Sequence, residues 1–113
     1  MWEVVVLPHF KKVLKPLAKK HRDLLLTVLF ELKNFDKNRA IKITEDVYKI
    51  RISPSSLPKG KSGGYRLYVL VMEIRKRLAP ITIYYKSEKE NLTLPELKDH
   101  LAIIMLELKD HKV

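Results

Sequence analysis

The sequence predicts an α+β fold: a small, antiparallel-dominated four-stranded sheet with an N-terminal helical hairpin on one face and a C-terminal helix. Three observations predict it. A β-rich segment opens the chain, two stretches with apolar residues at helical spacing follow it, and three strand-like segments precede a last amphipathic helix. A chain of 113 residues suits one hydrophobic core. We therefore expect a single domain spanning residues 1–113.

The first half of the chain reads as a strand followed by two helices. Residues 2–7 are β-rich, and Pro8 suits the first turn of a helix. The apolar residues at helical spacing are Phe10, Val13, Leu14 and Leu17 in the first helix, and Leu24, Leu25, Val28, Leu29, Leu32 and Phe35 in the second. The polar junction at 19–23 is short, which favours an antiparallel helical hairpin. Residues 34–39 have the composition of a loop.

The second half supplies the rest of the sheet and the last helix. Strands are predicted at Val47–Ile52, Tyr65–Val71 and Ile81–Tyr85. Thr93 and Glu96 have the spacing of a capping box, which opens a helix. The residues of this helix expected to face inward are Leu97, Leu101, Ile104, Met105 and Leu108.

Composition excludes several classes of function. The chain has no cysteine, which rules out disulfides, thiolate catalysis and cysteine-based zinc sites and fits a cytoplasmic location. No segment approaches the apolar length of a membrane span. The acids and histidines lack metal-ligand spacing, so we expect neither a metal nor a cofactor. The net charge of +10 favours a polyanionic partner.

A cationic, glycine-rich loop is the most informative motif. Lys59-Gly60-Lys61-Ser62-Gly63-Gly64-Tyr65-Arg66 runs directly into a predicted strand. Glycine allows the backbone to approach a ligand closely, and the basic side chains neutralise an anion. The loop therefore predicts a phosphate contact, although a solvated hairpin connection is the alternative.

Alternation along the three later strands separates an aliphatic face from a cationic one. The residues expected on the cationic face are Lys49, Arg51, Arg66, Tyr68, Thr82, Tyr84 and Lys86, with Lys59, Lys61 and Lys89 at its rim. Cations interleaved with tyrosines suit single-stranded RNA or DNA, since the charges contact phosphates and the rings stack on bases. The alternative is a polar sheet face that is merely solvated.

The order of elements and two motifs resemble the RelE/ParE superfamily of bacterial type II toxins. The run Lys61–Arg66 is similar to the HigB/RelE-type branch, as is the segment Ile83–Leu92, where a strand ends in Tyr-x-Lys and passes through Glu-Lys-Glu to the final helix. The resemblance covers Val4 to about Leu108. It implies the RelE-like toxin fold.

The resemblance also implies a function. Such a toxin enters the ribosomal A site and cleaves mRNA as an endoribonuclease, an antitoxin blocks it, and the complex of the two binds operator DNA. Arg66 matches the active-site arginine of the family, and Lys49 and Arg51 match its basic pair. Lys61 and Lys86 match flanking basic positions. Where RelE places a late active-site tyrosine, this chain has the region of Leu92 and Thr93.

RNA cleavage by the neighbouring 2′-hydroxyl also needs a group that accepts a proton. The four histidines, His9, His21, His100 and His111, fall outside the three strands, where packing or surface roles are expected. We therefore expect Tyr84 or Lys86 to act as the base, because neighbouring cations favour the tyrosinate and the neutral amine.

The predicted catalytic residues are Arg66, Tyr84, Lys86 and Lys61, and the predicted RNA-binding residues are Lys49, Arg51, Lys59, Tyr68 and Lys89. Two other functions remain open at this point. One is a ParE-like inhibitor of DNA gyrase, and the other is a nucleic-acid-binding module without catalysis.

Overall fold

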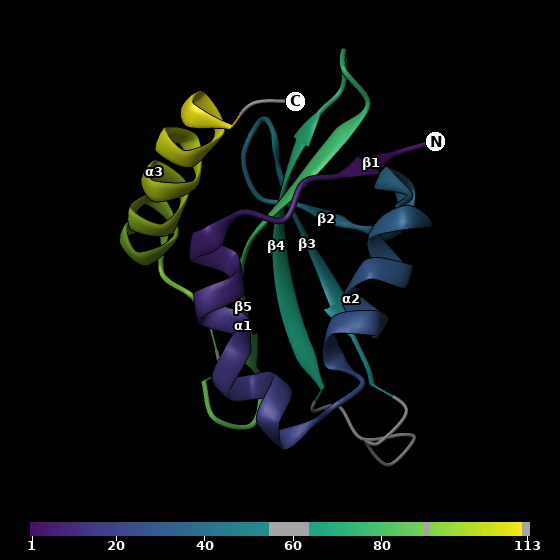
Figure 1. The fold of residues 1–113 in the computed structure, drawn as a ribbon, viewed down its shortest axis with the longest axis vertical. Helices are drawn as coiled ribbons and strands as arrows, with labels where there is room; N and C mark the ends of the chain where they lie inside the picture. Colours follow the sequence, from purple (N-terminus) through teal and green to yellow (C-terminus); the bar gives the residue numbers. More distant parts are fainter. Residues whose placement is uncertain (55–63, 90, 112–113) are drawn as a thin grey trace.

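The computed structural model describes residues 1–54, 64–89 and 91–111. Its elements in chain order are β1 (Glu3–Val4), α1 (Pro8–Lys20), α2 (Leu24–Lys33), the 3-10 helix η1 (Lys37–Arg39), β2 (Ile41–Lys42), β3 (Val47–Ile52), β4 (Tyr65–Met72), β5 (Arg77–Tyr85) and α3 (Leu94–Asp110). The fold is α+β, as the sequence predicts, with α1 and α2 in front of the sheet and α3 beside it (Figure 1).

The sheet has five strands rather than the four expected. Their order is β1-β5-β4-β3-β2, in which β1 runs parallel to β5 and all other pairs are antiparallel. The added strand is β2, a two-residue edge strand that pairs with β3. So short a segment carries no periodicity, which explains why the sequence pattern missed it. The opening strand is likewise shorter than residues 2–7, because only Glu3 and Val4 pair with β5.

Helices α1 and α2 cover one face of the sheet. Pro8 opens α1 in the predicted place, and Phe10 and Leu14 are buried against the sheet. From α2 a stripe of three residues is fully buried: Leu24, Val28 and Leu32. The two helices were expected to form a hairpin, but an apolar groove separates part of their facing surfaces, so each helix packs mainly on the sheet.

Helix α3 covers part of the opposite face. The capping box forms as predicted, since Thr93 accepts from the Glu96 backbone and Glu96 accepts from the Thr93 backbone. Leu97 and Ile104 are buried, whereas Met105, expected to face inward, is 53% exposed. Met105 directly follows buried Ile104, and one residue turns the helix by about 100°. None of the helices in the described ranges has the length and apolar character needed to cross a bilayer.

A β-bulge changes which face Ile81 occupies. In the pairing of β4 with β5, Tyr68 lies opposite Thr82 but Val69 lies opposite Pro80, so Ile81 is the extra residue. Unbroken alternation would place Ile81 on the same face as Ile83, which packs in the cluster under α1 and α2. Ile81 instead packs in the cluster under α3, together with Ala79 and Tyr84. A bulge of this kind cannot be read from alternation alone, because it breaks the alternation.

Two histidines and a glutamate connect α1 to α3. His9 Nε2 and His100 Nδ1 are 2.7 Å apart, and the His9 backbone N–H donates to the Glu107 carboxylate at 3.1 Å. Helix α1 has no side-chain cap and no acid in its first turn, so Glu107 supplies the negative charge at its N-terminus. The bond between the histidines needs one ring nitrogen to accept, which requires that nitrogen to be unprotonated.

This contact predicts a loss of stability in mild acid. Burial, followed by the charge of His9, lowers the pKa of His100 below its ordinary value of 6.5. Glu96 and Asp99 oppose this shift, and Lys89 reinforces it. Below pH 6.5 the unfolded chain therefore binds more protons than the folded one, and the free energy of unfolding falls as the pH falls. Thermal melting should give a lower Tm at pH 5.5 than at pH 7.5.

The matched variants are His100→Gln and His111→Gln, since His111 is exposed just after α3. His100→Gln should reduce the difference in Tm between the two pH values, and His111→Gln should leave it unchanged. An equal pH dependence in all three proteins would contradict the assignment to His100.

Candidate nucleic-acid interface

Strand pairing arranges the predicted site residues in two rows across the sheet. In one row Arg51 of β3 lies opposite Arg66 of β4, which lies opposite Tyr84 of β5. In the next row, Lys49 lies opposite Tyr68, which lies opposite Thr82. Directly opposed residues have Cβ atoms about 5 Å apart. The alternation pattern is therefore confirmed for these six residues, which we call the cationic face.

Arg66 is buried in spite of its charge. Its side chain is 8% exposed, and its Nη1 atom donates to the Tyr65 carbonyl at 3.3 Å. Burial, followed by repulsion from Arg51, lowers the pKa of Arg66, while Tyr84 opposes the shift. Arginine stays protonated in proteins, so the guanidinium is held as a cation in a partly desolvated place beside a second cation. The guanidinium group can donate hydrogen bonds to an anion at this position.

The neighbouring cations are Lys49, Arg51 and Lys86. Among the described residues, no ion pair includes Lys49, Arg51 or Lys86. Lys49 Nζ lies 5.7 Å from the centre of the Tyr68 ring and 3.5 Å from Asn91 Oδ1. Asn91 was not predicted as a site residue. It lies in the segment before α3, whose sequence carries no sign that it folds back toward β3.

The two tyrosines do not form the exposed stacking platform that the sequence predicted. Tyr68 is 3% exposed and Tyr84 is 7% exposed, and their ring centres lie 6.3 Å apart. Both belong to the apolar cluster that includes Leu97 and Ile104 of α3. Burial, followed by the neighbouring Tyr84, raises the pKa of Tyr68 to about 12. Tyr68 is therefore neither a base-stacking surface nor a group that ionises near neutral pH.

The Tyr84 hydroxyl is buried and makes no hydrogen bond of standard geometry to a described residue, although its interaction with the Tyr68 hydroxyl helps to raise the pKa of Tyr68. Buried hydroxyl groups are nearly always bonded, because a lost hydrogen bond to water costs about 1–3 kcal/mol. Arg66 lies directly opposite Tyr84 across the strand pair. An unpartnered hydroxyl group next to a desolvated guanidinium is a suitable place for an anionic oxygen.

Lys86 continues the cationic face beyond the end of β5. Its backbone N–H donates to the Gly64 carbonyl at 2.9 Å, which extends the ladder between β4 and β5 by one step. Gly64 has a φ of +63°, and a Cβ atom there would lie 3.0 Å from the Ile52 carbonyl oxygen. Glycine is thus required where the loop meets the sheet. Lys59 and Lys61, also predicted as site residues, lie outside the described residues.

Lys89 is not a free rim cation. It forms an ion pair with Glu96, the acid that caps α3. This pair is the largest cause that lowers the pKa of Glu96, which falls to about 2. The prediction that Lys89 binds RNA has no geometric support, because its charge is engaged at the start of the helix.

His21 contacts the same strands from the opposite side of the sheet. The sequence had predicted a packing or surface role for this residue. His21 Nδ1 lies 2.6 Å from the Tyr65 hydroxyl oxygen, and its ring also contacts Tyr85. Tyr65 precedes Arg66 in β4 and Tyr85 follows Tyr84 in β5, so His21 contacts both strands on the side away from the cationic face. Burial, with smaller contributions from Tyr85 and Glu88, raises the pKa of Tyr65 to about 12. The short helix junction was the one available signal for this contact.

No group of three or more histidines, cysteines or acids within the described ranges could hold a metal ion. The polar groups that the cationic face and Lys86 present are two guanidinium groups, two amines and a buried tyrosine hydroxyl group. These groups bind phosphate oxygens and stabilise negative charge.

The unpartnered hydroxyl group predicts an unusual response to mutation. Tyr84→Phe removes a buried polar group that makes no hydrogen bond of standard geometry to a described residue and leaves the ring in place. The free energy of unfolding should stay the same or rise by about 1 kcal/mol. Urea unfolding of both proteins measures this change. A loss of more than about 1 kcal/mol would show that the hydroxyl group is bonded within the folded protein.

Comparison with known proteins agrees with this architecture. No known protein family and no curated protein matches the sequence. Among solved structures, the fold is similar to that of the E. coli toxin RelE in the free state, determined for a mutant in which two arginines are replaced by alanine. The TM-score is 0.52 at 20% sequence identity, and the match covers 79% of this chain and 87% of that one. The chain therefore has a RelE-like fold.

Proposed function

We propose that this protein is the toxin of a type II toxin–antitoxin system and cleaves mRNA on the ribosome. The observation that carries the proposal is Arg66, a buried guanidinium opposite both Arg51 and Tyr84, on a fold similar to that of RelE. The motifs at 61–66 and 83–92 favour the HigB/RelE-type branch. One domain over residues 1–113 and a cytoplasmic location complete the proposal.

The reaction is an in-line displacement at phosphorus. The 2′-hydroxyl oxygen of one nucleotide bonds to the adjacent phosphorus, and the bond from phosphorus to the 5′-oxygen breaks. The 2′-proton passes to a base and the leaving 5′-oxygen takes a proton from water, which yields a 2′,3′-cyclic phosphate and a 5′-hydroxyl end. Arg66 stabilises the negative charge that develops on the phosphorane, and Arg51 and Lys49 hold flanking phosphates. No step requires a metal.

Tyr84 and Lys86 have different roles in this proposal. The Tyr84 hydroxyl is buried beside Arg66, so it donates a hydrogen bond to a phosphate oxygen. Lys86 is only half-buried, forms no ion pair with a described residue and lies where the cationic face opens beyond β5. An accessible amine in its neutral form can take the 2′-proton from a bound strand, whereas a covered hydroxyl group cannot reach it as readily. Lys86 is the proposed base.

The proposed partners follow from the same function. An antitoxin protein neutralises the toxin, the ribosome and its mRNA supply the substrate, and the toxin–antitoxin complex binds operator DNA. The net charge of +10 speeds association with each polyanion.

Replacing Arg66 should abolish cleavage while the protein stays folded. The test is an in vitro translation reaction in which primer extension maps mRNA 5′ ends. Arg66→Ala should reduce cleavage by about 100- to 1000-fold, because removal of one group that stabilises transition-state charge has an effect of this size. Arg66→Lys should restore little, since lysine lacks the planar fork of donors. The matched control is Arg75→Ala, which removes an exposed arginine in the turn after β4.

Thermal melting confirms that each variant is folded before activity is compared. In the same assay Lys86→Met should lose about 100-fold or more, and Tyr84→Phe about 10-fold. Cuts that persist in Arg66→Ala would contradict the proposal. Inhibited DNA supercoiling without mRNA cuts would indicate a gyrase inhibitor, and salt-dependent RNA binding without cuts would indicate a binding module.

A further inference from the structure

One histidine attaches the end of helix α1 to two strands of the cationic face. His21 Nδ1 lies 2.6 Å from the hydroxyl oxygen of Tyr65 in β4, and its ring centre lies 5.7 Å from that of Tyr85 in β5. The two tyrosine rings also pack against each other, with their centres 4.8 Å apart. Because the two tyrosines are direct partners across the strand pair, His21 contacts both strands at the same level of the sheet.

These tyrosines are the immediate neighbours of two groups that the proposed reaction uses. Tyr65 precedes Arg66 in β4. Tyr85 is the last residue of β5, and Lys86 follows it. The Lys86 backbone N–H donates to the carbonyl of Gly64, the residue before Tyr65, at 2.9 Å. Adjacent residues of a strand point to opposite faces, so a contact that fixes Tyr65 on one face also fixes the backbone from which Arg66 projects on the other.

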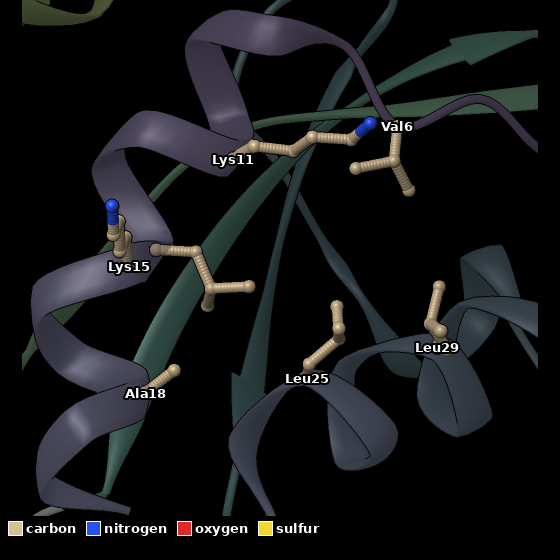
Figure 2. Close-up of a pocket in the computed structure, with 7 residues that line it drawn as sticks. Val6, Lys11, Lys15, Ala18, Leu25 and Leu29 are labelled. Carbon is tan, nitrogen blue, oxygen red and sulfur yellow. The ribbon is translucent and has the colours of Figure 1, made fainter. Parts of the chain in front are cut away.

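The backbone of His21 is itself fixed on both sides. Its N–H donates to the Leu17 carbonyl at 3.1 Å as the C-cap of α1, and its carbonyl accepts from the Leu24 N–H at 3.0 Å, where α2 begins. An apolar groove of about 360 Å³ lies between the two helices, and Figure 2 shows Ala18 and Leu25 on its facing sides. Because the helices do not pack closely there, contacts with the sheet hold this end of α1 in place.

The hydrogen bond to Tyr65 is the strongest of these contacts. Tyr65 is fully buried, and a buried hydroxyl group that loses its partner is strongly unfavourable. Burial raises the pKa of Tyr65 to about 12, so its hydroxyl group keeps its proton near neutral pH and can donate to Nδ1 or accept from it. The ion pair of Lys20 with Glu88, in the turn after β5, is more than half exposed on both sides and contributes little.

We propose that His21 is a positioning residue for RNA cleavage. Through the two tyrosines it holds the start of β4 and the end of β5, so that Arg66 and Lys86 keep the relative position that the reaction needs. This inference rests on the proposed function. His21 does not contact the RNA, because it lies on the side of the sheet away from the cationic face. A displacement of about 1 Å can slow a reaction about 100-fold, so the effect of His21 appears in kcat rather than in binding.

Steady-state kinetics on mRNA-programmed ribosomes test this role with graded substitutions. His21→Ala should lower kcat about 10- to 100-fold and change KM no more than about twofold. His21→Asn should restore most of the activity, because asparagine places a polar atom near the position of Nδ1 and can donate or accept. His21→Gln should restore little, since its polar atoms reach the position of Nε2. Tyr65→Phe should match His21→Ala, and the double variant should lose no more than either single variant.

Two measurements separate positioning from stability. Val28→Ala removes only apolar contacts from the cluster that contains Tyr65, so it should lower Tm and leave kcat unchanged. Amide hydrogen exchange in the full chain requires no activity. The Lys86 amide, which is bonded to the Gly64 carbonyl, should exchange about tenfold faster in His21→Ala and in Tyr65→Phe. In His21→Asn it should return toward the wild-type rate.

Several results would overturn the proposal. These are equal activity of His21→Asn and His21→Gln, a raised KM at an unchanged kcat, or a loss of kcat in Val28→Ala as large as in His21→Ala. Wild-type protein that cuts no mRNA would overturn the proposed function instead. In that case hydrogen exchange decides the remaining claim: faster exchange of the Lys86 amide supports its attachment through His21, and unchanged exchange contradicts it.

Discussion

The burial of the Arg66 guanidinium on a sheet face that also carries Arg51 is the constraint on which the rest of the site depends. The strand pairing makes the two cations neighbours, and burial removes much of the water around Arg66, whereas Arg51 is exposed. Such a place is unfavourable for a cation and favourable for an anion. The protein stabilises this arrangement through its packing, since strands β3, β4 and β5 are fixed by apolar clusters on both faces.

Helix α3 determines how much of the cationic face is open. Leu97 and Ile104 of this helix pack in the same cluster as Tyr68 and Tyr84. The capping box and the Lys89–Glu96 ion pair stabilise the start of the helix. Glu107 and His100 fasten its later turns to α1. Because α1 in turn packs on the opposite face of the sheet, these contacts join the layers on the two sides of the sheet. The face left for a ligand is a narrow cationic strip rather than a broad platform.

The elements with regular patterns could be predicted from the sequence. The boundaries of β3 and the start of α3 follow from alternation and from the Thr93–Glu96 spacing. The position of Lys49, Arg51 and Arg66 on one face of the sheet follows from strand periodicity. Features that depend on tertiary contacts could not be predicted. The two-residue strand β2 is too short to show a period-2 pattern, and the bulge at Ile81 interrupts the alternation of β5. The burial of Tyr68 and Tyr84 depends on where α3 packs.

The histidines illustrate the same limit. His9, His21 and His100 lie far apart in sequence, and none lies in a motif, yet two of them bond to each other and the third bonds to Tyr65. Which residues these histidines contact depends on how α1 packs against the sheet and against α3. Sequence spacing alone therefore places them correctly outside the site strands but says nothing about what they fasten together.

The central claim is that a phosphodiester strand binds at Arg66 and Arg51. The most direct measurement is an NMR titration of the arginine Nε–Hε resonances with a short single-stranded RNA whose 2′-hydroxyl groups are methylated, so that it cannot be cleaved. Arg75 and Arg77, beyond the far end of the cationic face, serve as internal references. We expect saturable shifts of the Arg66 and Arg51 resonances, weakened by salt, with the resonances of the reference arginines nearly unchanged. Saturation of the protein without any change at Arg66 would contradict it.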